Sequence, residues 1–145
     1  MVDVKILSGF TSNVPVTSRG GFFFGIGTPA VSVYLSSAGS PPFGSNEYVA
    51  VAVRRGLLLP RNVALAYRLV GLNGPAEPAG LGFTLLSGIF GLMGVTNLIV
   101  FPHSTTKSLA LSLLLIAIGL LSARRLYEIW SAKRLLSKWE PTPPP

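Results

Sequence analysis

The sequence predicts an all-α integral membrane protein built around a two-helix transmembrane hairpin. Its 145 residues are 49% hydrophobic and 12% charged, with a mean hydropathy of +0.56. Residues 79–101 form an uncharged run of about 23 residues, long enough to cross a hydrocarbon core about 30 Å thick. A second uncharged run, residues 108–123, follows after a short polar turn. Two such runs separated by one turn are typical of a hairpin.

The second run is short, but cationic side chains at its end can lengthen it. Arg124 and Arg125 follow it directly, and their long stems can lie along the apolar zone while the charges reach the interface. A buried helical pair in a soluble protein is the alternative, and it would normally show a polar face. The membrane hairpin is therefore the preferred interpretation.

Small side chains indicate how the two helices pack. Membrane helices gain little from burying apolar surface against each other, so close approach over small residues is a main source of association. An antiparallel hairpin would bring Gly94 near Ser108 and Gly91 near Ser112. The same faces could instead meet another subunit, and the sequence does not decide between the two. The expected helix-packing residues are Thr84, Ser87, Gly91, Gly94, Ser108, Ser112, Gly119 and Ser122.

Basic residues predict the orientation of the hairpin. They lie before the first run and after the second, whereas the connecting turn carries only Lys107. By the positive-inside rule, both termini lie on the matrix, cytoplasmic or stromal side. Glu128 lies one helical turn from Arg124 and Arg125, which predicts a weak surface pair. The expected membrane-interface residues are Arg124, Arg125, Tyr127 and Trp130.

The remaining chain is assigned to three further segments. Residues 1–44 are interrupted by many glycines and prolines and are expected to be an irregular, partner-binding segment. Residues 45–78 are expected to form short amphipathic helices at the membrane surface, although residues 48–53 also alternate like a strand. Residues 124–145 are read as a basic amphipathic helix extension with a proline-rich tail. A third membrane segment over residues 21–38 is an alternative, which Pro29 and several hydroxyl side chains disfavour.

The sequence contains little that could support catalysis. Its five acidic residues are scattered, cysteine is absent, and neither apolar run contains an ionisable residue. His103, the single histidine, could ligate a haem iron or a chlorophyll magnesium, but a solvated turn residue is the preferred interpretation. We therefore expect no catalytic residues, no cofactor, no metal site and no enzymatic activity. The net charge of +7 is explained by topology and anionic lipid, without nucleic acid as a partner.

These features favour a non-catalytic accessory subunit of a larger membrane protein complex. The expected partners are other membrane subunits and lipids. The expected location is an energy-transducing membrane, respiratory or photosynthetic. The mitochondrial inner membrane is favoured, with the thylakoid or the bacterial inner membrane as alternatives. A second hypothesis is a free-standing small membrane protein that binds anionic lipid or shapes the bilayer.

Overall fold

The computed structural model describes residues 3–37, 39–56, 61–101 and 105–141. The chain divides into two units. One is Leu81–Tyr127, and the other combines Met1–Gly80 with Glu128–Pro145. His103, the candidate ligand of the turn, lies outside the described residues.

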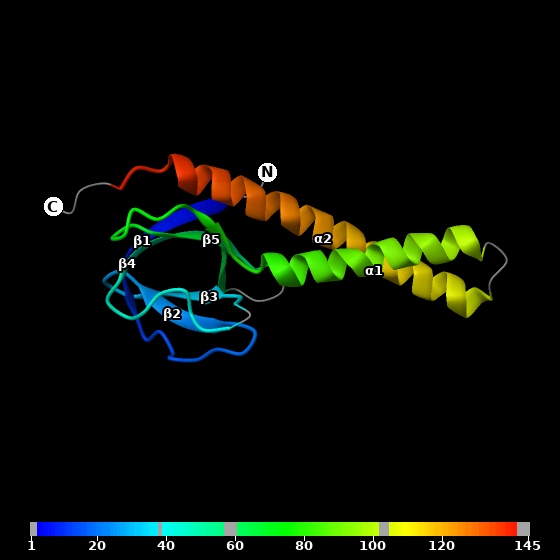
Figure 1. Cartoon of the computed structure of the whole chain (residues 1–145), viewed down its shortest axis with the longest axis horizontal. Coiled ribbons are helices and arrows are strands. Elements are labelled where there is room, and N and C mark those ends of the chain that lie inside the picture. Colours follow the sequence, from blue (N-terminus) through cyan, green and yellow to red (C-terminus); the bar gives the residue numbers. More distant parts are fainter. Residues whose placement is uncertain (1–2, 38, 57–60, 102–104, 142–145) are drawn as a thin grey trace. The chain divides into compact units, whose positions relative to one another are not determined.

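The larger unit is built on a β-sheet that closes into a barrel (Figure 1). Its strands are β1 (Val4–Ser12), β2 (Phe22–Ile26), β3 (Val31–Leu35), β4 (Tyr48–Arg55), β5 (Asn62–Leu69) and the short β6 (Glu77–Pro78). They are hydrogen-bonded in the order β3-β2-β1-β4-β5-β6. A parallel pairing of β3 with the start of β5 joins the two sides of the sheet.

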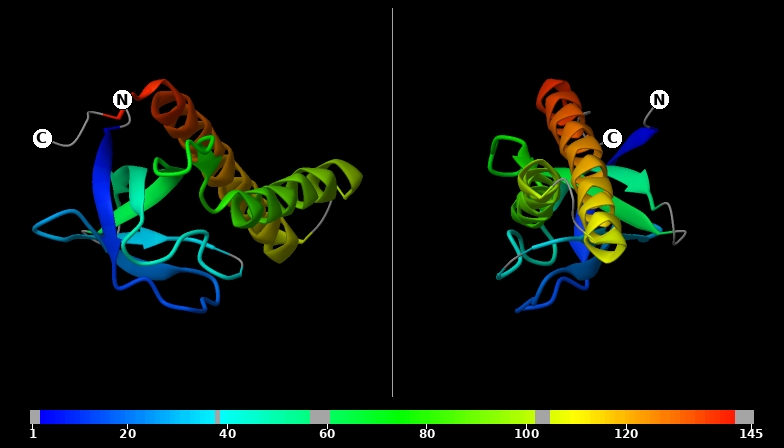
Figure 2. Two further views of the ribbon diagram at one scale, coloured as in Figure 1. Left: turned by 60° about the vertical axis from the view of Figure 1, so that its left-hand side comes forward. Right: turned by 90° about the vertical axis from the view of Figure 1, so that its right-hand side faces the viewer.

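The strand order identifies the type of barrel. Strands β4-β1-β2-β3 lie side by side in the order of a Greek key, and all of their pairings are antiparallel. Strand β5 continues from β4 and closes on β3. A five-stranded Greek-key barrel is the architecture of the OB-fold. Figure 2 shows its strands from two further directions.

This barrel contradicts the predicted all-α fold. Residues 1–44, expected to be irregular, form β1, β2 and β3, and residues 21–38 contain the β2–β3 hairpin instead of a third membrane segment. Residues 45–78, expected to form surface helices, contain β4, β5 and β6. The physical reason is that the glycines and prolines lie mainly in the connections between short strands, which non-local hydrogen bonds then stabilise.

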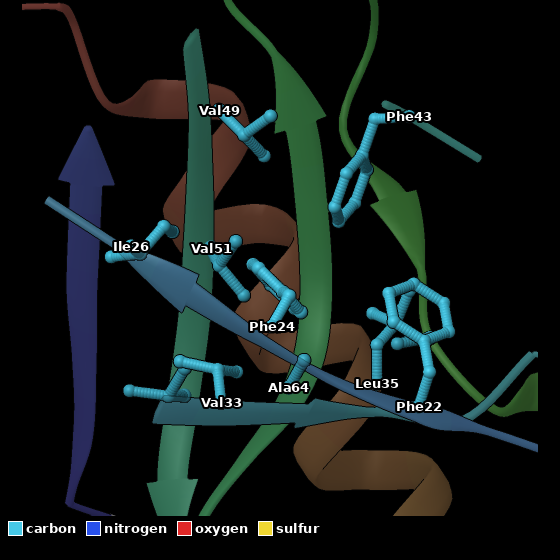
Figure 3. Close-up of a cluster of buried hydrophobic side chains, with 11 residues drawn as sticks. Phe22, Phe24, Ile26, Val33, Leu35, Phe43, Val49, Val51 and Ala64 are labelled. Carbon is cyan, nitrogen blue, oxygen red and sulfur yellow. The ribbon is translucent and has the colours of Figure 1, made fainter. Parts of the chain in front are cut away.

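The barrel interior is an apolar core with several aromatic rings (Figure 3). Phe22 and Phe24 point inward from β2 and are 6% and 2% exposed, whereas Phe23 between them is 50% exposed. This is the alternation of a strand with one buried face. Phe43 packs edge-on against Phe24 with ring centroids 5.0 Å apart, and it comes from the segment between β3 and β4.

Strand β4 is buried on both faces. Val49, Val51 and Val53 belong to the barrel core, while Ala50 and Ala52 face a second cluster on the outside of the barrel. That cluster contains Ile129, Ala132 and Leu136 from the C-terminal part of α2, together with small residues of the sheet. Alanine lets a helix backbone approach the sheet closely, so the end of α2 becomes part of the folded barrel unit.

The second unit contains helix α1 (Leu81–Val100) and the first part of helix α2. The whole of α2 is Thr106–Lys138, and its part up to Tyr127 belongs to this unit. Both helices are long and apolar enough to cross a membrane. Only 17% of the most apolar window of α1 and 11% of that of α2 is buried by the protein itself. The predicted apolar helix pair is therefore present, although α2 continues well beyond the apolar run, to Lys138.

Candidate functional site

The two helices of the hairpin unit meet most closely at a pair of glycines. A Cβ atom added at Gly91 would lie 2.4 Å from the Cα of Gly119, and one added at Gly119 would lie 2.6 Å from the Cα of Gly91. Such distances exclude any side chain at either position unless the backbones separate. The contact is a close backbone approach of the kind that stabilises membrane helix pairs.

The register of this contact differs from the expected one. Gly94 lies against Ser112 and Leu115, and Gly91 lies against Gly119, whereas the sequence suggested Gly94 near Ser108 and Gly91 near Ser112. The helices are thus shifted relative to the predicted alignment. Sequence spacing places small residues on a common face, but it does not fix which residue meets which.

A polar contact accompanies the glycines. The amide Nδ2 of Asn97 donates to the hydroxyl of Ser112 at 2.6 Å and to that of Ser108 at 3.3 Å. Ser112 is fully buried. Asn97 was not among the predicted packing residues. The signal was present, because a lone amide in an apolar span normally faces another helix.

The other expected packing residues have varied surroundings. Thr84 is buried, and Ser122 is 8% exposed. The hydroxyls of Ser87 and Ser122 donate to carbonyls of their own helices, those of Phe83 and Ile118. These two bonds satisfy the hydroxyls locally, so they contribute no attraction between the helices.

An open groove of about 580 Å³ runs beside the glycine contact. Nothing lies within 4 Å of a Cβ added at Gly88, so the groove is open at that position. Its lining is almost entirely apolar and comes from both helices. The lining residues are Thr84, Leu85, Gly88, Ile89, Gly91, Leu92, Val95, Ile116, Gly119, Leu120, Ser122, Ala123 and Leu126.

The expected membrane-interface residues lie around the end of the apolar part of α2. Arg124 is exposed, Tyr127 is 71% exposed and Trp130 is 54% exposed. Arg125 is partly buried, and its Nε atom has no hydrogen-bond partner within the described protein. The Nζ of Lys133 lies 5.2 Å from the centre of the Trp130 ring, a cation–π contact that joins a charge to an aromatic ring. Aromatic and basic side chains next to an apolar span are typical of a membrane interface.

A buried ion pair joins the end of α2 to the barrel. Glu128 is 2% exposed, and its carboxylate accepts a charge-assisted hydrogen bond from Arg54 of β4. The side chain of Arg54 is 25% exposed, so water reaches only the arginine side of the pair. The contact that the structure shows for Glu128 is thus with a strand of the barrel, in addition to anything the spacing along its own helix predicts.

Arg68 also forms hydrogen bonds within the barrel unit. Its Nε donates to the carbonyl of Gly74 at 3.0 Å, and its Nη1 donates to the carbonyl of Trp139 at 3.2 Å. Arg68 therefore ties the turn after β5 to the end of α2.

An aromatic and cationic cluster lies on the outer face of the barrel. Phe23 of β2 and Tyr34 of β3 are cross-strand partners with ring centroids 5.0 Å apart. The guanidinium carbon of Arg61, which precedes β5, lies 4.7 Å from the Tyr34 ring centre and 5.7 Å from that of Phe23. We call Phe23, Tyr34 and Arg61 the outer aromatic cluster. This cluster was not predicted, although a strand through Phe22, Phe23 and Phe24 would turn the middle ring to the opposite face from the other two.

Among the residues that the structure describes, no cluster of side chains could hold a metal ion. No group of three histidine, cysteine, aspartate or glutamate side chains gathers there. Three features therefore remain as candidates for function: the hairpin groove, the end of α2 and the outer aromatic cluster. No protein-family model matches the chain, and no curated protein or solved structure is significantly similar to it.

Proposed function

We propose that the protein is a non-catalytic accessory subunit of a membrane protein complex. In this proposal the hairpin unit inserts in the membrane and packs against a helix of another subunit. The barrel unit is the part outside the membrane that contacts partners. The observation that carries the proposal is the hairpin unit. Its outer surface is apolar, and its two helices pack against each other through small residues such as Gly91 and Gly119.

The exposed surface of α1 supports insertion in a membrane. Its only buried residues are Thr84, Gly91 and Gly94, while large apolar side chains such as Leu92 and Ile99 are 69% and 73% exposed. In water such a surface would be unfavourable by roughly 25 cal/mol per Å² of apolar area. Lipid or protein must therefore cover it.

The groove beside Gly88 supports a protein neighbour within the membrane. Membrane helices associate by close packing over small residues, and the groove offers Gly88, Gly91 and Gly119 along an apolar floor. A partner helix can approach most closely at Gly88, where no atom of the chain fills the space.

In its finer form, the proposal places both termini on the matrix, cytoplasmic or stromal side of an energy-transducing membrane. Its support is the distribution of basic residues, with Arg124 and Arg134 following the second apolar run and Lys107 alone in the turn. Protease protection in sealed vesicles and fractionation of the tagged chain test these two points separately.

Gly88→Leu is expected to release the chain from its complex. The new side chain fits the open groove without disturbing the hairpin, but it occupies the place of the partner helix. Overpacking by about 1–3 kcal/mol corresponds to about a tenfold loss of the comigrating assembly. The measurement is native electrophoresis of mild-detergent extracts, followed by mass spectrometry of the assembly.

Gly82→Leu is the matched control for this experiment. Gly82 is also in α1 with open space around its Cα, but it does not line the groove. A wild-type chain that migrates at its own mass would contradict the proposed function. An assembly that survives Gly88→Leu would place its contact elsewhere.

Binding of anionic lipid by a free-standing protein is the second candidate function. The observation that favours it is the end of α2, where exposed Trp130 carries Lys133 over its ring and Arg134 and Lys138 are exposed. A basic residue near an anionic membrane surface contributes about 1 kcal/mol.

Arg134→Gln combined with Lys138→Gln is therefore expected to reduce retention of anionic lipid. Two lost charges of about 1 kcal/mol each correspond to about a thirtyfold weaker interaction. Native mass spectrometry of the detergent-solubilised chain with phosphatidylserine or phosphatidylcholine measures the retained lipid. Equal retention of both lipids by the wild-type chain would argue against this candidate.

A further inference from the structure

The outer aromatic cluster holds an arginine whose charge is available to a ligand. Among the described residues, Arg61 is exposed and forms no ion pair with a carboxylate. Its guanidinium lies over Tyr34 and close to Phe23. The N–H groups of a guanidinium lie at the edge of its plane, where they can donate in pairs to a planar anion.

We propose that the outer aromatic cluster binds an acidic peptide segment of a partner protein. A carboxylate of that segment accepts two hydrogen bonds from Arg61, and an adjacent apolar side chain packs on Phe23. The inference rests on the proposed function, because it names the kind of partner that an accessory subunit would contact through its barrel.

The charge of the barrel favours an acidic ligand. The sequence from Val4 to Asn46 contains no aspartate or glutamate, nor does the sequence from Tyr48 to Ala76. Strands β1 to β5 therefore carry no carboxylate to compete for Arg61. Arg19, which lies in the connection before β2, and Arg55 at the end of β4 are both exposed. A surface with exposed cations and no acid in strands β1 to β5 attracts an anion and repels a basic segment.

Stacking also reduces the cost of binding. A free arginine loses rotamer freedom when it grips a ligand, whereas the rings of Tyr34 and Phe23 already restrict Arg61. Tyr34 is itself held by a hydrogen bond from its hydroxyl to the carbonyl of Gly20 at 3.4 Å. Phe23 remains half exposed and offers an apolar contact beside the charge.

These observations favour a peptide over single-stranded nucleic acid. Proteins that bind single strands combine bare aromatic faces for the bases with several cations along the backbone. Here Arg61 covers a face of the Tyr34 ring, and the cluster holds one arginine. Oligonucleotide binding by other OB-folds is an association with the fold, so it does not by itself assign a ligand here.

The test is a fluorescence-anisotropy titration of the full chain, purified in a neutral detergent. The probe is a labelled short peptide that alternates glutamate with phenylalanine. Its two comparison ligands are the same peptide with lysine in place of glutamate and a labelled oligothymidylate of equal charge. Saturable binding of the acidic peptide alone is the expected result.

Arg61→Gln is expected to weaken binding of the acidic peptide about tenfold, because a bidentate charge-assisted contact is lost. Arg61→Lys keeps the charge but not the planar fork, so it should weaken binding by a smaller factor. Lys107→Gln is the control: it removes a positive charge from an exposed position on α2 that belongs to no proposed binding surface, and it should change affinity less than about twofold.

Three results would overturn the inference. They are absence of saturable binding, equal binding of the lysine peptide, and equal losses of affinity in Arg61→Gln and Lys107→Gln. Tighter, Arg61-dependent binding of oligothymidylate would overturn it in favour of a nucleic-acid ligand. If the chain binds the peptide but forms no assembly in native electrophoresis, the inference about this surface stands and the proposed function fails. The two failures are therefore distinguishable.

Discussion

Arg54→Leu is expected to lower the free energy of unfolding of the barrel unit by about 3 kcal/mol. The substitution removes the Arg54 side of a buried ion pair, and Glu128 is only 2% exposed. Removing one member of a buried ion pair costs about 3–5 kcal/mol, because the other charge stays buried and uncompensated. The lower end of that range applies because the Arg54 side chain is 25% exposed. Denaturant unfolding in mild detergent, followed by the fluorescence of Trp130 and Trp139, measures the change.

Two further variants show whether the loss comes from the ion pair. Arg55→Leu changes the next residue of β4, which is exposed, and should alter stability by less than about 0.5 kcal/mol. The double variant Arg54→Leu with Glu128→Leu should recover most of the lost stability, since no charge is then left buried. A double variant as unstable as the single one would show that Arg54 stabilises the barrel through its packing alone.

The place of Glu128 shows what the sequence can and cannot indicate. Helical spacing correctly put Glu128 within one turn of Arg124 and Arg125, a relation that needs no knowledge of the fold. The pair with Arg54 joins residues 74 positions apart in the chain. It exists only because the end of α2 packs on β4, so spacing along one helix could not reveal it.

The two helices could be predicted because their signal is local. A run of uncharged apolar residues long enough to cross a bilayer is visible in any window of the sequence. The barrel could not be predicted in the same way. Residues 48–53 were assigned to a helix although they also alternate like a strand, because β4 is largely apolar and its pattern does not decide between the two. Strands of five residues such as β2 give a weak signal alone.

The outer aromatic cluster was missed for a related reason. Phe23 and Tyr34 meet through the pairing of β2 with β3, and Arg61 joins them because β3 pairs in parallel with the start of β5. Phe23 and Arg61 are 38 positions apart, so only the closed barrel brings them together. A segment expected to be irregular, followed by short surface helices, gives no reason to compare these residues.

Gly91→Leu is expected to separate the two helices of the hairpin unit. The Cβ at position 91 would lie 2.4 Å from the Cα of Gly119. This is a backbone atom, so a side-chain rotation cannot relieve the clash. The helices must therefore move apart, which also breaks the hydrogen bond from Asn97 to Ser112. A weakening of the helix contact by about 2 kcal/mol corresponds to about a thirtyfold slower cross-link between the helices.

A disulfide reporter measures this separation directly. The chain has no cysteine, so Asn97→Cys with Ser112→Cys introduces a single possible disulfide between side chains that are in contact. The rate of oxidative cross-linking is compared with and without Gly91→Leu. Gly88→Leu is the control, because it adds the same side chain three residues earlier, where nothing lies within 4 Å. If both leucine variants cross-link at the reporter's own rate, the glycine pair does not determine the hairpin contact. If only Gly91→Leu is slow, close backbone approach at Gly91 and Gly119 holds the helices together, and the groove beside Gly88 remains free for a neighbour.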